Sequence, residues 1–211
     1  MTRRISAREL IEKFTDAGSV ESWDSPIDVS SYSPEYRADI AKAKERSGND
    51  ESILTGRATL DGRPIAFIVN DFSFLAGSIG QAAAERIVAA VQRATAERLP
   101  LVASSSSGGT RMQEGTPAFV KMIDISRAVM QHRAAGLPYI VYLRHPTTGG
   151  VFASWGSLAH VSIAEPEALV GFLGPKVFEL LNSKPFPTGV QRSENLADCG
   201  DVQRRMRADD L

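Results

Sequence analysis

Residues 99–115 read LPLVASSSSGGTRMQEG, an apolar run that ends in four serines and two glycines. The apolar run predicts a buried strand, and the residues after the glycines have the pattern of a helix. Hydrolases place a nucleophilic serine at such a strand-to-helix turn, but the glycines here do not give the G-x-S-x-G spacing of that motif. We therefore interpret the serines as small side chains that leave room and cap the following helix.

Two other passages repeat this order of apolar strand, small-residue loop and helical stretch. One runs from PIAFIVND (64–71) into a helical stretch at 81–99, and the other from LPYIVYLRH (137–145) into VFASWGSLAH (151–160). Strands that alternate with helices predict an α/β fold, with right-handed crossovers and a largely parallel sheet covered by helices. Ligands of such sheets bind beyond the carboxyl ends of the strands, where the three loops would gather.

The region before these passages has a different texture. Asp61 and Gly62 separate two apolar runs and predict a β-hairpin. The first fifty residues are polar and rich in Ser, Asp and Pro. Within them, Ser6 with Glu9 forms a capping box, and Ser33 starts a second helical pattern. We expect an arm of two amphipathic surface helices over residues 1–50 and one α/β domain over residues 51–211.

Composition bounds the class of protein. The chain has 211 residues, of which 43% are hydrophobic, so it can bury a large core. Its 24 basic and 25 acidic residues nearly cancel, which argues against nucleic acid or an anionic membrane as a partner. Cys199 is the only cysteine, which excludes an internal disulfide framework and a cysteine-clustered zinc site. No run approaches the roughly eighteen apolar residues that span a bilayer, so we expect a soluble, cytoplasmic protein.

Several common nucleotide and catalytic motifs are absent. No lysine is followed by Ser or Thr, so there is no Walker A loop, and the glycines never give G-x-G-x-x-G. The three histidines are scattered and suggest neither a metal pair nor a triad. His145 adjoins a glycine loop and has two interpretations, a functional group or a loop residue that orients backbone.

Two glycine loops offer a different chemistry. Gly108, Gly109 and Thr110 form one loop, and Gly149 and Gly150 form the other, with Thr147 and Thr148 before them. Glycine lets the main chain approach a ligand closely, and the first N–H groups of a helix have no internal partner. Paired amides from two loops could stabilise an oxyanion that develops on a carbonyl. The alternative is that each pair is simply a tight strand-to-helix turn.

Arg111 follows the first glycine loop at what the pattern predicts to be the first helical turn. A cation is unfavourable at the positive end of the helix dipole, so we expect Arg111 to pair with an anion. The candidates are Glu114, three residues later, and a phosphate or carboxylate of a substrate. We expect Gln113 and Glu114 to be caps or loop anchors rather than acid–base groups.

With these residues in view, the chain resembles the carboxyltransferase subunits of biotin-dependent acyl-CoA carboxylases, particularly the beta subunit of acetyl-CoA carboxylase. The resemblance runs from about Ile53 to Met206. Its motifs occur in the family's order and are DFSFLAGSIG, SGGTRMQEG, AGLPYIVYLRHPTTGGVFAS, SIAEPEALVGFLGPKVFE and GVQRSENL. The family has a crotonase-like fold, so the resemblance implies a β-β-α spiral that binds a CoA thioester and stabilises an enolate.

The resemblance also implies roles for particular residues. Gly108 and Gly109 would belong to the oxyanion-hole loop, and Thr147 to Gly150 to the second active-site loop. Gly77, Ser78 and Gly80 would border the CoA channel at the start of the next helix. The carboxyl group would come from carboxybiotin on a carrier protein, and the biotin nitrogen would take the α proton of the acyl thioester, so that no protein base or metal is required.

This chain differs from the family's pattern in two ways. The nearest bacterial beta subunits carry a four-cysteine zinc module before the core, whereas the arm here has no cysteine. The family also works as two crotonase-like halves, and this chain contains only the first. The second half is either a separate alpha-type partner or a later part of a longer fused protein. We expect a homo- or hetero-oligomer with an alpha-type carboxyltransferase half, biotin carboxylase and biotin carboxyl carrier protein as partners, acting in malonyl-CoA formation for fatty acid synthesis.

Two other functions remain open from the sequence. The same oxyanion chemistry would serve a malonyl-thioester decarboxylase subunit. A chain of this kind could also be a non-catalytic half that binds CoA or supports assembly, although such a scaffold would not need unhindered amides in two loops.

Overall fold

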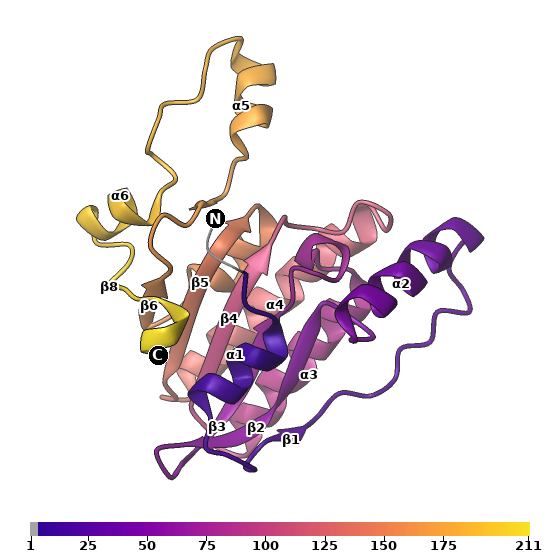
Figure 1. Ribbon diagram of the computed structural model, residues 1–211, viewed down its shortest axis with the longest axis vertical. Coiled ribbons are helices and arrows are strands. Elements are labelled where there is room, and N and C mark those ends of the chain that lie inside the picture. The colour runs from indigo at the N-terminus through magenta and orange to yellow at the C-terminus, as the bar shows by residue number, and fades with distance from the viewer. Residues whose placement is uncertain (1–3) are drawn as a thin grey trace.

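A single mixed sheet is the centre of the fold (Figure 1). The computed structural model describes residues 4–211, whose strands follow the order β1-β2-β3-β4-β5-β6-β8, while β7 pairs with β5 beside this path. The first three strands pair antiparallel, and every pairing from β3 to β8 is parallel. The α/β class with a largely parallel sheet is therefore confirmed. The strands are β1 (Glu21–Ser22), β2 (Ile53–Leu60), β3 (Arg63–Asn70), β4 (Leu101–Ser107), β5 (Tyr139–Thr148), β6 (Val161–Ala164), β7 (Val170–Gly171) and β8 (Arg204–Arg205).

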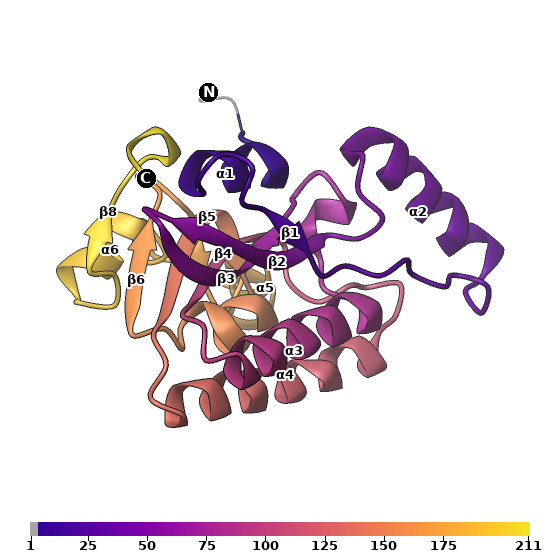
Figure 2. The ribbon, with the colours of Figure 1, turned by 90° about the horizontal axis from the view of Figure 1, so that it is seen from below.

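Helices cover both faces of this sheet (Figure 2). On one face, α3 (Gln81–Ala96) and α4 (Thr116–Ala134) pack side by side and bury the main apolar core. On the other face, α1 (Ala7–Phe14) buries Leu10 and Ile11 against Phe67 and Tyr142. The remaining helices are α2 (Pro34–Ser47), α5 (Pro175–Asn182), α6 (Ser193–Asp198), the 3₁₀ turns η1 (Leu75–Gly77) and η3 (Ala208–Asp210), and the π-helical turn η2 (Phe152–Gly156).

The hairpin predicted at Asp61 and Gly62 is confirmed. It joins β2 to β3 with Leu60 opposite Arg63. Both turn residues have positive φ, 50° and 73°, which the two-residue turn that matches strand twist requires.

Both predicted arm helices are also confirmed. The Ser6 side chain accepts from the Glu9 N–H while the Glu9 carboxylate accepts from the Ser6 N–H, so the α1 capping box is complete. The Ser33 hydroxyl accepts from the Tyr36 N–H at the start of α2. The arm also adds β1 to the edge of the sheet. The boundary at residue 50 stays a prediction, because nothing in the structure divides the chain there.

One predicted helix start is wrong, and a second predicted helix is shorter than expected. The helix expected at Gly108 to Thr110 begins only at Thr116, because a turn over Arg111 to Glu114 intervenes. The serines therefore do not cap α4. After Gly149 and Gly150, the expected helix is only a short turn that ends at Gly156. Helix α5 projects away from the rest of the fold (Figure 1).

Candidate active site

The structure brings the two glycine loops together beyond the carboxyl ends of β4 and β5. A Cβ placed on Gly149 would lie 3.6 Å from the Gly109 Cα, and one placed on Gly109 would lie 3.5 Å from the Thr148 carbonyl oxygen. Both glycines have positive φ, 114° for Gly109 and 65° for Gly149, so the backbone conformation also favours glycine. The loops can approach this closely because neither glycine has a side chain.

Three of the expected amide donors are already used inside the protein. The Gly108 N–H donates to the Ala76 carbonyl at 3.0 Å, the Gly109 N–H to the Ser107 hydroxyl at 3.0 Å, and the Gly149 N–H to the Gly171 carbonyl at 3.1 Å. Among residues 4–211, the N–H groups of Thr110 and Gly150 have no acceptor. Thr110 and Gly150 are neighbours, since a Cβ on Gly150 would lie 3.1 Å from the Thr110 hydroxyl oxygen. The available donors in these loops are thus Thr110 and Gly150.

The four serines lie in β4 and are buried, and none is paired with a histidine side chain. Each hydroxyl has a hydrogen-bond partner: Ser104 with the Arg144 guanidinium, Ser105 with the Thr147 hydroxyl, Ser106 with the His145 carbonyl and Ser107 with the Gly109 N–H. This arrangement agrees with the interpretation that they are not nucleophiles.

The two threonines of the second loop differ in exposure. Thr147, expected to bind substrate, is fully buried, and its hydroxyl lies 2.9 Å from the Arg144 carbonyl oxygen. Its side chain therefore stabilises the loop from inside and does not face a ligand. Thr148 is half-buried, with its hydroxyl 3.3 Å from the Ser107 carbonyl oxygen.

The segment Gly77 to Gly80 holds the first glycine loop in place. Ile79 and Thr110 form a parallel bridge, in which the Ile79 N–H donates to the Gly109 carbonyl at 3.0 Å and the Arg111 N–H donates to the Ile79 carbonyl at 2.9 Å. A Cβ on Gly77 would overlap the Ser106 carbonyl oxygen. Gly77 therefore allows the segment to lie against the end of β4.

The start of α3 is already occupied by a carboxylate of the chain. Gly80 precedes α3, and the Gln81 N–H donates to Glu114 Oε2 at 2.6 Å. A Cβ on Gly80 would overlap Glu114 Oε1. Gly80 therefore makes room for the Glu114 carboxylate, and its expected place beside the CoA channel stays a prediction. The interpretation of Glu114 as a cap is confirmed.

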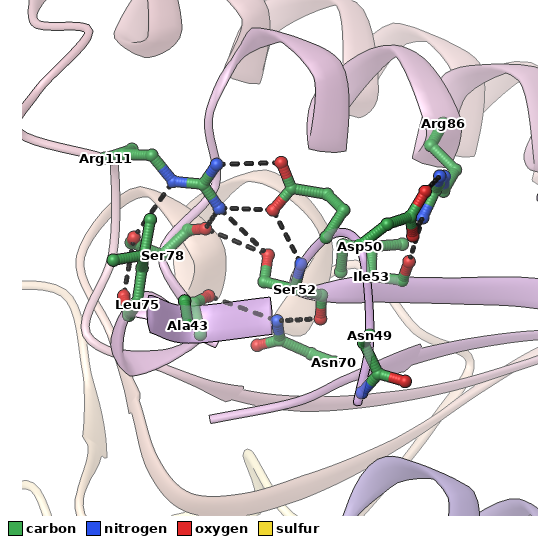
Figure 3. A network of polar contacts seen from close by, with 12 residues as sticks. Ala43, Asn49, Asp50, Ser52, Ile53, Asn70, Leu75, Ser78, Arg86 and Arg111 are labelled. Carbon is green, nitrogen blue, oxygen red and sulfur yellow. Dashed lines mark hydrogen bonds and ion pairs between the residues drawn. The ribbon is translucent and has the colours of Figure 1, made fainter. Parts of the chain in front are cut away.

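Arg111 has a different partner from either of those expected (Figure 3). Its side chain is only 1% exposed and makes a two-pronged ion pair with Glu51, through Nη1 to Oε2 at 2.8 Å and through Nη2 to Oε1. It also donates to the Ser78 carbonyl at 2.6 Å, while Glu114 is more distant at 3.9 Å. The sequence offered no signal for Glu51, because sixty residues separate it from Arg111.

The ion pair with Glu51 stabilises the charged form of Arg111. Burial disfavours the charged guanidinium, but the hydrogen bonds and attraction of Glu51 outweigh that cost and raise the pKa of Arg111 above its usual value. Because Arg111 is buried and its charge is already neutralised, the prediction that it binds a substrate anion does not fit the structure.

His145 orients backbone, the second of its two interpretations. Its Nδ1 accepts from the Leu169 N–H at 3.1 Å, and the peptide bond to Pro146 is cis. Burial, followed by the charge of Arg4, lowers the pKa of His145. The neutral ring therefore remains an acceptor near neutral pH.

No group of three or more His, Cys, Asp or Glu side chains within residues 4–211 could hold a metal ion. Over the same residues, no helix combines the length and the apolar character needed to cross a membrane.

Comparison of the sequence with known protein families identifies the family to which this chain belongs. The carboxyl transferase domain model matches residues 17–196. The chain belongs to the carboxyl transferase domain family. It is 55% identical, over 99% of its length, to the probable biotin-dependent acyl-coenzyme A carboxylase beta3 subunit of Mycobacterium tuberculosis, and covers 42% of that protein. It is 39% identical, over 98% of its length, to the acetyl-coenzyme A carboxylase carboxyl transferase subunit beta of Fusobacterium nucleatum, and covers 69% of it.

A solved structure supports the fold of this carboxyl transferase domain. Transcarboxylase 12S superposes with a TM-score of 0.82 over 98% of this chain and 39% of that chain, at 21% identity. The crotonase-like fold that the sequence resemblance implied is therefore confirmed.

Proposed function

We propose that this domain transfers a carboxyl group from carboxybiotin to a short acyl-CoA, as a carboxyltransferase component of an acyl-CoA carboxylase. The observation that carries the proposal is that two neighbouring residues, Thr110 and Gly150, each have an N–H group without an acceptor within residues 4–211. They belong to two glycine loops in contact with each other. Membership of the carboxyl transferase domain family and the names of the relatives support this chemistry.

The donors suit an oxygen that becomes more negative during reaction. A thioester carbonyl develops charge when its α carbon loses a proton, and preorganised N–H groups in a site closed to water stabilise that charge. Gly109 and Gly149 let the two loops that carry the donors lie against each other, because they lack side chains. We assign Gly108, Gly109 and Gly149 to shaping the two loops, with Thr110 and Gly150 as the donors.

Because Thr110 and Gly150 are assigned to the thioester oxygen, carboxybiotin would bind next to these two N–H groups and not to them. Bound there, carboxybiotin would supply the carboxyl group and the base that takes the α proton. The chain would hold one acceptor oxygen through Thr110 and Gly150 and orient it through the rigid loop backbones. Gly77, Ser78 and Thr148 flank these loops and remain candidates to line the path of the acyl-CoA.

We further propose that a second carboxyltransferase half covers this site. Apolar side chains are exposed along the first half of α4 (Phe119, Val120 and Ile123) and on the projecting α5 (Leu180 and Leu181). An exposed apolar face of this kind is typical of a protein interface. A covering half would exclude water and strengthen the amide dipoles. Biotin carboxylase and a biotin carboxyl carrier protein would complete the enzyme, with the cytoplasm as its compartment.

A single substitution at Gly150 tests the proposal. Gly150→Ala places a methyl group 3.1 Å from the Thr110 hydroxyl oxygen and 3.3 Å from Met122 Cγ, so it crowds the contact between the two loops. Ala keeps the backbone N–H, so the variant acts by displacing a donor and not by deleting it; complete loss of one oxyanion donor lowers the rate by about 10²- to 10³-fold, which sets the upper limit. We expect a loss of at least tenfold in malonyl-CoA-dependent carboxylation of biotin by the assembled enzyme.

The matched control is Gly136→Ala, at the far end of α4. Gly136 has positive φ and no atom within 4 Å of its Cβ position, so this variant strains backbone without touching the site. We expect it to keep wild-type activity below its melting temperature. Equal activity of the Gly150 variant and the control would contradict the assignment, and malonyl-CoA decarboxylation without carboxylated biotin would favour a decarboxylase.

A further inference from the structure

Buried side chains at both ends hold in place the turn between the first glycine loop and α4. Arg111 begins this turn and Glu114 ends it, with side chains 1% and 4% exposed. The tip of the turn is open to solvent, and Met112 is 87% exposed. The buried contacts at the two ends therefore fix the position of the turn, whereas at its tip the exposed Gln113 side-chain N–H donates to Asp39 Oδ2 at 3.5 Å, the limit of a hydrogen bond.

Tyr36, on the arm helix α2, contacts both Arg111 and Glu114. Its hydroxyl donates to Glu114 Oε1 at 2.6 Å and accepts from Arg111 Nη1 at 3.1 Å. The ring is buried, and α2 is seated by the packing of Ile40 and Ala43 with Phe74. A single hydroxyl from the arm thus connects the two ends of the turn.

A shift of this turn would reach the proposed donors directly. Thr110 precedes Arg111, and its position relative to Gly150 depends on the bridge to Ile79, which the Arg111 N–H helps to form. The Arg111 guanidinium also donates to the Ser78 carbonyl, next to Ile79, so side chain and backbone hold the same segment (Figure 3). Small displacements of reacting groups have large effects on rate.

We propose that Tyr36 is a positioning residue, through which the arm helix α2 sets the place of the Thr110 donor relative to Gly150. This inference rests on the proposed function for its kinetic consequence, and on geometry alone for its effect on the loop. It gives the arm, which lacks cysteines for a zinc module, a role in the active site.

The test compares Tyr36→Phe with two other variants of the arm. Tyr32→Phe is a matched control: its ring lies 4.7 Å from the Tyr36 ring between centroids, but its hydroxyl has no hydrogen-bond partner among residues 4–211. Ile40→Ala weakens the apolar seating of α2 without removing a polar contact. This last variant separates loss of stability from loss of position.

Steady-state kinetics of the assembled enzyme give the first readout. Tyr36→Phe should lower kcat about five- to tenfold and leave KM for the acyl-CoA within about twofold, because a misplaced donor weakens transition-state contacts more than ground-state binding. Tyr32→Phe should match wild type. Ile40→Ala should lower the melting temperature and yet keep kcat within about twofold when it is assayed below that temperature.

Hydrogen–deuterium exchange of residues 108–115 in the full chain gives a readout that needs no activity. Exchange there should rise in Tyr36→Phe and not in Tyr32→Phe. Unchanged exchange would overturn the proposal even if the carboxyltransferase assignment is correct. Faster exchange with unchanged kcat, or an equal loss of kcat in Ile40→Ala, would also overturn it. Faster exchange in Tyr36→Phe, together with no carboxyl transfer by the wild-type enzyme, would refute the proposed function and leave the positioning of the loop supported.

Discussion

Glu51→Gln should destabilise the protein strongly, because it removes the carboxylate that pairs directly with a buried cation and leaves the Glu114 carboxylate at 3.9 Å. Arg111 would keep the Ser78 carbonyl, the Ser52 hydroxyl and the Tyr36 hydroxyl as acceptors. None of these carries a negative charge. Glu51 Oε1 also accepts from the Ser52 N–H at 2.6 Å, a bond that the amide of Gln can retain.

The magnitude follows from the burial of this pair. Removal of one partner of a buried ion pair costs about 3–5 kcal/mol. We take the lower figure, about 3 kcal/mol, because Gln preserves the volume and one acceptor. For a chain of this size, each kcal/mol lowers the melting temperature by about 2–4 °C, so the expected fall is about 6–12 °C.

Urea and thermal unfolding of the full chain, followed by circular dichroism, measure this change. The control is Glu21→Gln, whose carboxylate pairs with Arg57 at 2.7 Å on the surface, with both side chains 49% exposed. An exposed pair of this kind contributes about 0–1 kcal/mol. A melting temperature for Glu51→Gln within 2 °C of that control, on the order of the effect of a surface pair, would refute the reasoning.

A second variant separates charge from packing. The double variant Glu51→Leu with Arg111→Met removes both charges and keeps apolar volume, and a buried ion pair can often be replaced in this way at little cost. The double variant should therefore be more stable than Glu51→Gln. The opposite order would show that geometry, and not the unpaired charge, dominates.

Other predictions concern stability and pH. Burial lowers the pKa of the fully buried His132 below its usual value, so its contribution to stability is present above about pH 6.5 and is lost as the pH falls. His132→Asn should flatten the fall in unfolding free energy between pH 7 and pH 5 without abolishing it, because the pKa of His145 is lowered too. Gly77→Ala should lower the melting temperature more than Gly136→Ala. Both positions have positive φ, but only at Gly77 would the added Cβ overlap a backbone oxygen. A chelator should leave the melting temperature unchanged, and a fall on chelation would reveal a structural metal.

Local sequence signals predicted local structure well. The Asp61–Gly62 turn and the Ser6–Glu9 capping box depend on residues within a few positions of each other, and both formed as expected. The alternation of apolar runs with helical stretches predicted the parallel sheet, because strand and helix periods are properties of single segments. These signals place the two glycine loops at one edge of the sheet.

The sequence did not predict how the loop amides are used. The Ser107 hydroxyl accepts from the Gly109 N–H, and a turn over Arg111 to Glu114 delays α4 to Thr116. The Glu51–Arg111 pair joins residues sixty positions apart, and no pattern in either segment selects the other as its partner. The Glu51–Arg111 contact is set by tertiary packing. Tertiary packing also buries Thr147, so its side chain does not belong to the proposed binding surface.

Transfer of label from carboxyl-labelled malonyl-CoA to biotin tests the central claim most directly. The assay uses the full chain assembled with a second carboxyltransferase half, with the Gly150→Ala variant in parallel. We predict labelled carboxybiotin in step with the acetyl-CoA formed, and a loss of at least tenfold in the variant. Acetyl-CoA formed without labelled biotin, or equal transfer by wild type and variant, would contradict carboxyl transfer at these two loops.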